Sequence, residues 1–138
     1  MASTVHLLVA TADREIYRGE ASMVVAPGSA GDLGIYPKHA PLLCSLKAGE
    51  LRVTKSDGVE VDEVFVSGGF MEVQPDMITV LADCAERAAD VDMAATMEAA
   101  RAAEELIAGK KDDLDFATAE AELAVATAKL AWLRKKKI

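Results

Sequence analysis

Proline and glycine are confined almost entirely to the first part of this 138-residue chain. All four prolines and eight of the nine glycines precede residue 87, whereas residues 87–138 hold only Gly109 and are crowded with alanine. Proline and glycine mark turns, and alanine is the strongest helix former. The sequence therefore predicts a turn-rich domain at residues 1–86 and a helical domain at residues 87–138.

The first domain reads as short apolar runs separated by turns. The predicted strands are residues 5–9, 21–26, 51–54, 59–66, 70–73 and 77–81. Asp57-Gly58 between two alternating runs is a strong signal for a β-hairpin, and a second hairpin is expected at residues 74–76. Residues 28–34 are glycine-rich but lack the Lys-Ser/Thr ending of a phosphate-binding loop, so we expect a turn or bulge there. Many short, closely spaced strands predict an antiparallel β-sandwich or β-barrel.

The second domain reads as two helices joined near Gly109, which together form an antiparallel helical hairpin. Asp90 and Asp92 are candidate N-caps of the first helix, because a short carboxylate accepts hydrogen bonds from unpaired backbone N–H groups. Gly109 suits the end of that helix. The second helix begins with acidic residues and ends with basic ones, as the helix dipole favours.

Two apolar seams with the same 3-4-3-4-3 spacing run along the second helix. The alanine seam comprises Leu114, Ala117, Ala121, Ala124, Ala128 and Ala131, and the mixed seam comprises Phe116, Ala119, Leu123, Ala126, Leu130 and Leu133. Small residues let helices approach closely, so we expect the alanine seam to face the first helix. The expected partners there are Met93, Met97, Ala100, Ala103 and Ile107. Such an interface buries little apolar area, which is compatible with a hairpin that opens.

The charge and the reactive side chains exclude several classes of function. The formal net charge is -8, which disfavours binding to nucleic acid. Most of this charge lies in residues 1–86, where 6 basic and 13 acidic side chains give -7. His6, His39, Cys44 and Cys84 lack metal-ligand spacing, and neither cysteine lies in a nucleophile motif. We expect no metal, no cofactor, no catalytic residue and reduced thiols.

The chain shows no sign of entering a membrane by itself. Its first residues lack the basic and apolar regions of a signal peptide, and no apolar run approaches the ~18 residues that cross a bilayer. We therefore expect membrane association only through partners.

Residues 31–43 read Gly-Asp-Leu-Gly-Ile-Tyr-Pro-Lys-His-Ala-Pro-Leu-Leu, with two prolines that restrict the chain. This segment resembles the signature of the epsilon subunit of bacterial F-type ATP synthases. Residues 66–73 and 79–83 resemble the next two motifs of that family, in the same order and spacing. Together with the two-helix tail, the similarity covers essentially the whole chain. It implies an amino-terminal β-sandwich followed by a helical hairpin.

The resemblance also implies a function. The family's epsilon subunit is a non-catalytic rotor subunit of the central stalk in the proton-translocating F-type ATP synthase. It couples c-ring rotation to ATP synthesis, and its C-terminal helices restrain ATP hydrolysis. The implied partners are the gamma subunit, the c-ring and, through the helices, the beta and alpha subunits. The implied location is peripheral, at the cytoplasmic face of the cell inner membrane.

Some roles can be carried over to single residues. Asp32 would face the c-ring, and Tyr36 and His39 would lie near the gamma subunit. The basic residues near the C-terminus would meet acidic segments of the beta subunits; they are Lys129, Arg134, Lys135, Lys136 and Lys137. The same charges also complement the dipole of the last helix, and the sequence leaves both roles open.

One motif of the family is degenerate here. Some members bind ATP on the helical hairpin through an Ile/Leu-Asp-x-x-Arg-Ala motif and arginines of the second helix. Residues 91–96 read Val-Asp-Met-Ala-Ala-Thr, so Ala95 replaces the arginine, and the matching second-helix positions hold Val125 and Lys129. Without guanidinium groups a triphosphate loses its bidentate partners, which predicts weak or absent ATP binding.

Two other classes of function remain as alternatives. A free-standing β-sandwich binding module would need an exposed aromatic platform, and aromatic residues make up only 4% of the chain. A small enzyme would need a catalytic constellation, which the sequence lacks. Co-purification with a gamma subunit and a c-ring would discriminate the rotor subunit from both.

Overall fold

The computed structural model describes residues 3–90, 93–109 and 113–136. It divides into two compact units, Met1–Ala89 and Asp90–Ile138. We refer to them as the sandwich unit and the helical unit. The division falls close to the change in composition near residue 87.

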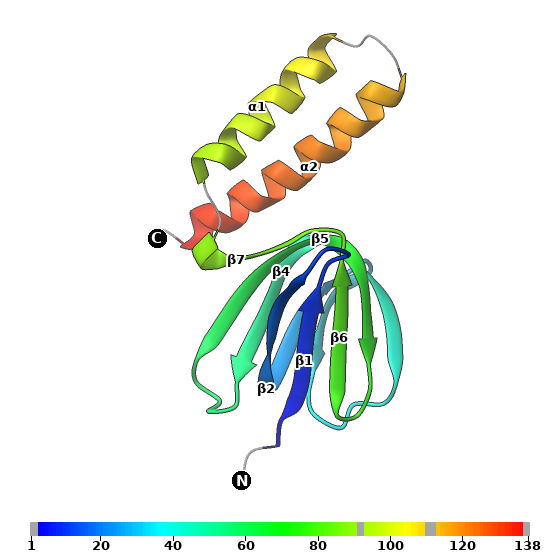
Figure 1. The fold of residues 1–138 in the computed structure, drawn as a ribbon, viewed down its shortest axis with the longest axis vertical. Helices are drawn as coiled ribbons and strands as arrows, with labels where there is room; N and C mark the ends of the chain where they lie inside the picture. Colours follow the sequence, from blue (N-terminus) through cyan, green and yellow to red (C-terminus); the bar gives the residue numbers. More distant parts are fainter. Residues whose placement is uncertain (1–2, 91–92, 110–112, 137–138) are drawn as a thin grey trace. The chain divides into compact units, whose positions relative to one another are not determined.

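The described part of the sandwich unit contains seven strands (Figure 1). They are β1 (Val5–Ala10), β2 (Glu15–Gly28), β3 (Gly31–Ile35), β4 (Leu42–Lys55), β5 (Val61–Val73), β6 (Met77–Ala82) and β7 (Ala85–Arg87). Their order is β1-β6-β5-β4-β2-β3, with β7 paired to β5 and β1 also paired to β2. The β-sandwich predicted from the sequence is confirmed.

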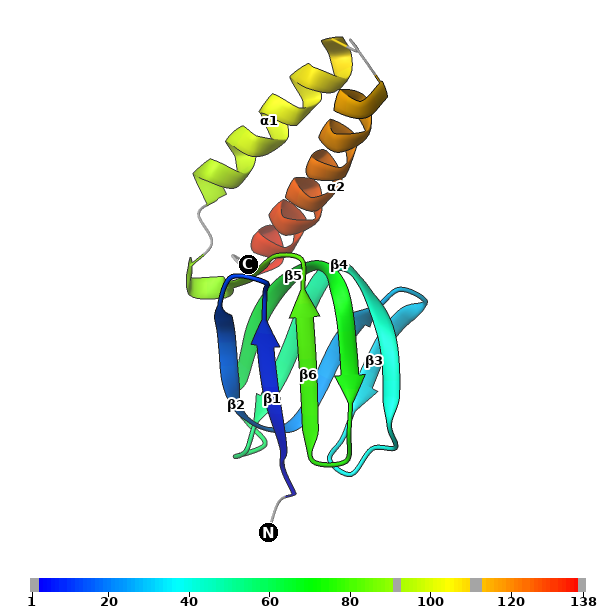
Figure 2. The same cartoon turned by 45° about the vertical axis from the view of Figure 1, so that its right-hand side comes forward.

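One strand pair is parallel, whereas an antiparallel sandwich was expected. β1 pairs with β6 in parallel, and Figure 2 shows both arrows pointing the same way. The reason is topological. Strands β1, β2, β4, β5 and β6 form a closed ring, and four of its links are antiparallel. Direction alternates at each of those links, so the fifth link of a five-membered ring must be parallel.

Inward-facing aliphatic side chains fill the sandwich, as the alternation along each strand predicts. The largest fully buried members of this core are Val5, Leu7, Val9, Val24, Ile35, Leu51, Val53, Val64, Val66, Met71 and Ile78. Tyr17 is the aromatic residue of the described core cluster. Burial of these apolar surfaces is the main force that stabilises the closed sheet.

Both predicted hairpins are confirmed. Between β4 and β5, Gly58 has a positive φ of 75°. The Asp57 carboxylate accepts hydrogen bonds from the backbone N–H groups of Val59 and Glu60 at 2.8 and 2.9 Å. Between β5 and β6, the N–H of Gln74 donates to the carbonyl of Met77 at 2.8 Å.

Residues 59–66 and 70–73 were expected to form separate strands, but both contribute to the single strand β5. The intervening glycines take φ values of 109° at Gly68 and 121° at Gly69, which other residues rarely adopt. Val64–Val66 pair with β7, whereas Gly69–Val73 pair with β6. The glycines therefore lie where the neighbouring strand changes, and they let one strand serve both.

The glycine-rich segment 28–34 is partly a turn, as expected, and partly a strand. The chain turns at Ser29 and Ala30, and β3 then pairs with β2, with Asp32 opposite Pro27. Alternation is short here and is interrupted by glycine, so the sequence pattern did not reveal this edge strand. Because residues 31–35 belong to this strand, the loop that follows spans only residues 36–41.

The helical unit contains the short 3₁₀ turn η1 (Ala88–Asp90) and the helices α1 (Met93–Gly109) and α2 (Asp113–Lys136). The two long helices pack antiparallel against each other, which confirms the predicted hairpin (Figure 1). The predicted end of the first helix at Gly109 is also confirmed. Asp90 lies in η1, and the other candidate cap, Asp92, lies outside the described residues. Over the described residues, neither helix is long and apolar enough to cross a membrane.

The prediction that the alanine seam faces α1 is wrong. Of its described members, Ala117, Ala121, Ala124 and Ala131 are exposed, and Ala128 is half-buried. The mixed seam is turned inward instead; it comprises the buried residues Ala119, Ala126 and Leu133 and the half-buried residues Leu123 and Leu130. Leucine buries more apolar area than alanine, so facing the mixed seam inward is the more stable choice.

The small residues of this interface come largely from α1. Thr96, Ala100 and Ala103 are buried at helical spacing, and Ile107 is half-buried. Met97, which was expected in the interface, is 51% exposed. The interface therefore sets α1 alanines against the mixed alanine and leucine seam of α2.

Candidate functional site

Three large apolar side chains are exposed side by side on the outside of the sandwich. Phe70 of β5 pairs directly with Leu81 of β6 and with Ser45 of β4. Leu43 lies two residues before Ser45 and points to the same side of the sheet. The exposed fractions of Leu43, Phe70 and Leu81 are 69%, 59% and 58%. We refer to these three residues as the outer face.

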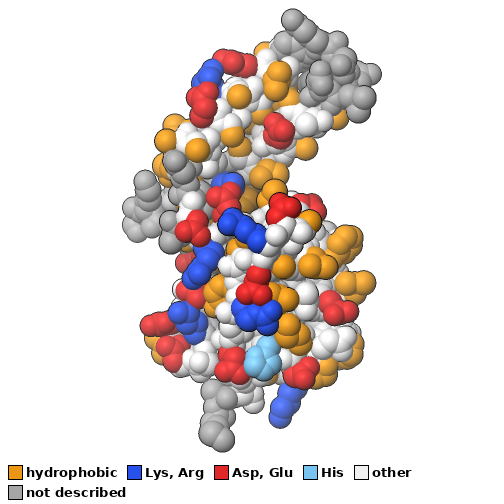
Figure 3. All heavy atoms as spheres, in the orientation of Figure 1, with side chains coloured by type: hydrophobic (Ala, Val, Ile, Leu, Met, Phe, Trp, Pro, Cys, Tyr) orange, Lys and Arg blue, Asp and Glu red, His pale blue; other side chains and the backbone are white. Residues whose placement is uncertain are grey.

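Further apolar residues surround the outer face. Ala10 of β1 pairs with Leu81, and Leu8 pairs with Thr79; all three neighbours are half-buried. Figure 3 shows hydrophobic side chains gathered along one edge of the sandwich, away from most of the charged ones. A contiguous exposed apolar patch on a small domain marks an interaction surface.

Asp32 lies in a groove next to the outer face. The groove has a volume of about 420 Å³ and is lined by residues 28–33 and 43–45. Hydroxyl groups of Ser29 and Ser45 lie 2.8 Å apart across it, and the N–H of Ser29 donates to the carbonyl of Ser45 at 3.0 Å. Leu43 belongs both to the groove and to the outer face. The structure thus brings an exposed carboxylate close to the apolar surface.

Tyr36 and His39 lie on the loop at residues 36–41, outside the lining of this groove. The Tyr36 side chain is exposed, and the Nδ1 atom of the half-buried His39 lies 2.6 Å from the carbonyl oxygen of Ala40. Lys38 has a positive φ of 66°, and its N–H donates to the carbonyl of Pro75 at 2.8 Å. This hydrogen bond fixes the loop to the β5–β6 turn, so its side chains are held in place.

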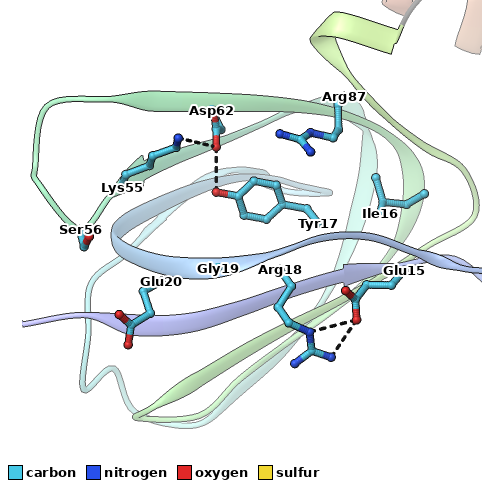
Figure 4. A pocket seen from close by; sticks show the side chains of 10 residues that line it. All are labelled: Glu15, Ile16, Tyr17, Arg18, Gly19, Glu20, Lys55, Ser56, Asp62 and Arg87. Carbon is cyan, nitrogen blue, oxygen red and sulfur yellow. Dashed lines mark hydrogen bonds and ion pairs between the residues drawn. The ribbon is translucent and has the colours of Figure 1, made fainter.

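A second, more polar pocket lies elsewhere on the sandwich unit (Figure 4). It has a volume of about 620 Å³ and is lined by Glu15, Ile16, Tyr17, Arg18, Gly19, Glu20, Lys55, Ser56, Asp62 and Arg87. The Tyr17 hydroxyl donates to Asp62 at 2.9 Å, and the Lys55 ammonium lies 3.5 Å from the same carboxylate. Burial, and then the hydrogen bond to Asp62, raises the pKa of Tyr17. Its hydroxyl group therefore stays protonated at neutral pH and remains a donor.

The remaining sequence-derived candidates lie on the helices or concern reactive groups. Lys129 is half-buried and engaged in contacts, and Arg134 is exposed, whereas the side chains of Lys135, Lys136 and Lys137 lie outside the described residues. Within the described residues, no cluster of His, Cys, Asp or Glu could hold a metal ion. Cys44 and Cys84 are unpaired thiols there, and burial raises the pKa of the Cys44 thiol.

Comparison with known proteins identifies the family. Residues 4–88 match the family described as "ATP synthase, Delta/Epsilon chain, beta-sandwich domain". The chain is 52% identical over 130 residues to the ATP synthase epsilon chain of Acidithiobacillus ferridurans, which covers 94% of this chain and 91% of that relative. The chain belongs to the ATP synthase epsilon family. A second member of this family, from Thioalkalivibrio sulfidiphilus, is 48% identical over 135 residues, or 98% of this chain and 96% of the relative.

Solved structures support the fold of this epsilon-family chain. It matches a chain of the Euglena gracilis mitochondrial ATP synthase with a TM-score of 0.80 at 20% identity, covering 94% of this chain and 81% of the other. A chain of the Tetrahymena thermophila mitochondrial ATP synthase central stalk and c-ring matches with a TM-score of 0.57 at 17% identity, covering 99% and 98%. At these identities the likeness concerns the fold alone.

Nucleotide binding by the helical unit is expected to be weak. Ala95 is exposed on α1, and Val125 and Lys129 are half-buried on α2; Val91 and Asp92 lie outside the described residues. None of these described positions supplies a guanidinium group for a triphosphate. Titration of the isolated chain with MgATP should give a dissociation constant above about 1 mM, which corresponds to only about 4 kcal/mol of binding free energy. A micromolar constant would contradict this prediction.

Proposed function

We propose that this chain is a non-catalytic rotor subunit of the central stalk in a proton-translocating F-type ATP synthase. In this role it couples rotation of the c-ring to ATP synthesis and lies peripherally at the cytoplasmic face of the membrane, held there by partners. Family membership over nearly the full length supports the role. In this proposal the sandwich unit docks onto the gamma subunit and the c-ring, and the helical unit regulates ATP hydrolysis.

The outer face is the observation that carries the docking role. Leu43, Phe70 and Leu81 place three large apolar side chains in solvent at adjacent positions. Exposure of apolar surface to water is unfavourable, and burial against a partner would remove this free-energy cost. The proposed occupant is the gamma subunit, with Tyr36 and His39 of the neighbouring loop as additional contacts. Coexpression of the full chain with its gamma subunit tests this role. A stable complex is expected, and separate elution of the two chains would overturn it.

Asp32 is the proposed contact with the polar loops of the c-ring. It is exposed, belongs to the groove that adjoins the outer face through Leu43, and carries a charge that a basic loop complements. Such exposed charge pairs contribute only ~0–1 kcal/mol each, so Asp32 orients the contact more than it strengthens it.

The helical unit is the proposed restraint on ATP hydrolysis. Its interface sets the small buried residues Ala100 and Ala103 of α1 against the mixed seam of α2, so separation of the helices loses less apolar burial than a leucine-to-leucine interface would. The separated tail would contact the beta and alpha subunits, with Lys129, Arg134 and Lys135 to Lys137 meeting acidic segments of beta.

Truncation after residue 88 is expected to raise ATP hydrolysis by the assembled complex while assembly and coupling persist. The cut leaves β1 to β7 and the outer face intact. The rise should reach at least about twofold if the tail holds half or more of the complexes at any time. Hydrolysis and proton pumping by matched full-length and truncated complexes measure it. An unchanged hydrolysis rate would remove the inhibitory role of the tail.

A further inference from the structure

β7 is the last strand before the helical unit, and it is only three residues long. It pairs with Val64–Val66 of β5. At its entry, the N–H of Ser67 donates to the carbonyl of Cys84 at 2.9 Å. At its exit, the guanidinium carbon of Arg87 lies 5.6 Å from the centre of the Tyr17 ring. So short a strand depends on such end contacts, because its own ladder offers few hydrogen bonds.

The Tyr17 ring is a fixed platform for Arg87. Tyr17 is 8% exposed, and its hydroxyl is tied to Asp62 as described above. Asp62 is in turn held by Lys55, which also lies 3.2 Å from Glu60. In Figure 4 a dashed line joins the Tyr17 hydroxyl to Asp62, and the Arg87 guanidinium lies near the same ring. The contact thereby joins the end of β7 to β2 and to the β4–β5 hairpin.

Arg87 differs from the other cations of this pocket. Arg18 forms two hydrogen bonds with Glu15, at 2.8 and 3.0 Å, and Lys55 pairs with two carboxylates. Among the described residues, no carboxylate lies within ion-pair distance of Arg87. In the described part of the chain, its close charge interaction is the attraction to the face of the Tyr17 ring.

We infer that the Arg87–Tyr17 contact fastens the exit of β7 and so fixes the point from which the helical unit departs. Arg87 is a positioning residue for the tail. Without the contact, β7 opens more often, and up to three residues join the segment between the two units. A longer connection lowers the effective concentration of the tail at its target. The regulatory half of this inference rests on the proposed function.

Hydrogen exchange on the full chain tests the contact itself. In Arg87→Met, which keeps much of the side-chain length but removes the charge, the backbone amides of Ala85–Arg87 should exchange about two- to fivefold faster than in the unaltered chain. Arg87→Lys keeps a cation and should restore most of the protection. Arg18→Met is the matched control, because it removes a charge from the same pocket without touching β7. Unchanged exchange in Arg87→Met, or equal acceleration in Arg18→Met, would overturn the contact's role.

ATP hydrolysis by the assembled complex tests the consequence for the tail. Arg87→Met should raise hydrolysis by up to about twofold, since three added residues lower the effective concentration by about that factor. The same substitution in the chain truncated after residue 88 should change nothing. If truncation raises hydrolysis and Arg87→Met does not, the positioning role is wrong. If truncation itself has no effect, the proposed inhibitory function is wrong. The hydrogen-exchange result then decides by itself whether the Arg87–Tyr17 contact stabilises β7.

Discussion

Replacing Phe70 by glutamate is expected to weaken binding of the full chain to its gamma subunit by at least about thirtyfold. Phe70 lies between Ser45 and Leu81 in the middle of the outer face and is 59% exposed. Central aromatic residues of an interface contribute about 2 kcal/mol or more, and each 1.4 kcal/mol is a factor of ten. The glutamate also brings a charge that must lose its water without gaining a partner. Calorimetric titration of the gamma subunit measures the change.

Val59→Glu is the control for Phe70→Glu. Val59 is 80% exposed at the turn between β4 and β5, away from the outer face. It introduces the same charge on the same unit, so gamma binding should stay within about twofold of the unaltered chain. Both variants should keep the unfolding midpoint of the original, because neither side chain lies in the core. Equal affinity of Phe70→Glu and the unaltered chain would show that the outer face is not the docking surface.

Replacing Gly69 by alanine is expected to destabilise the sandwich unit by about 2 to 6 kcal/mol. A Cβ atom at this position would lie 2.1 Å from the carbonyl oxygen of Leu81 and 2.8 Å from the Cα atom of Ala82. The φ of 121° adds backbone strain of ~1–3 kcal/mol, and the overlap adds ~1–3 kcal/mol. Both clashing atoms belong to the backbone of β6, so β5 and β6 must separate to relieve the overlap. Urea unfolding followed by circular dichroism measures the loss.

Substitutions at two other glycines distinguish the effect of backbone strain from that of steric overlap. Gly58 has a positive φ of 75° but nothing within 4 Å of an added Cβ, so Gly58→Ala should cost only the ~1–2 kcal/mol of a left-handed alanine. Gly19 shows no such φ, and its added Cβ would meet Tyr17 at an ordinary 3.5 Å, so Gly19→Ala should stay within ~0.5 kcal/mol. If Gly69→Ala were no worse than Gly58→Ala, the overlap at β6 would not be the cause.

Much of the sandwich could be predicted because its signals are local. The Asp57-Gly58 turn works through one carboxylate and one positive φ, both of which depend on residues adjacent in sequence. The end of α1 at Gly109 was likewise predicted from a single residue type. By contrast, the union of residues 59–66 and 70–73 into β5 required two neighbours, β7 and β6, that lie later in the chain. Sequence alone reads Ser67-Gly68-Gly69 as a break, because glycine weakens the interior of a strand.

The candidate site was harder to predict from the sequence than the fold. Alternation along residues 70–73 places Phe70 and Glu72 on one side of the strand and the buried Met71 and Val73 on the other. That pattern could have marked Phe70 as an exposed aromatic residue. Nothing local joins it to Leu43 or Leu81, which come from other strands. The register of β4, β5 and β6 makes them neighbours.

The sequence by itself determined that strands give way to helices near residue 87, that hairpins form at residues 57–58 and 74–76, and which residues of the predicted strands alternate into the core, because turn chemistry and periodicity act over a few residues. Only the tertiary structure decided which seam of α2 faces α1. Both seams have the same spacing, so the period alone cannot show which of them faces α1. The mixed seam does so because Leu123, Leu130 and Leu133 bury more apolar area than alanines would. The same holds for the parallel β1–β6 pair, the outer face and the Arg87–Tyr17 contact. Each joins segments distant in sequence, and only closure of the five-strand ring or pairing across the sheet brings them together.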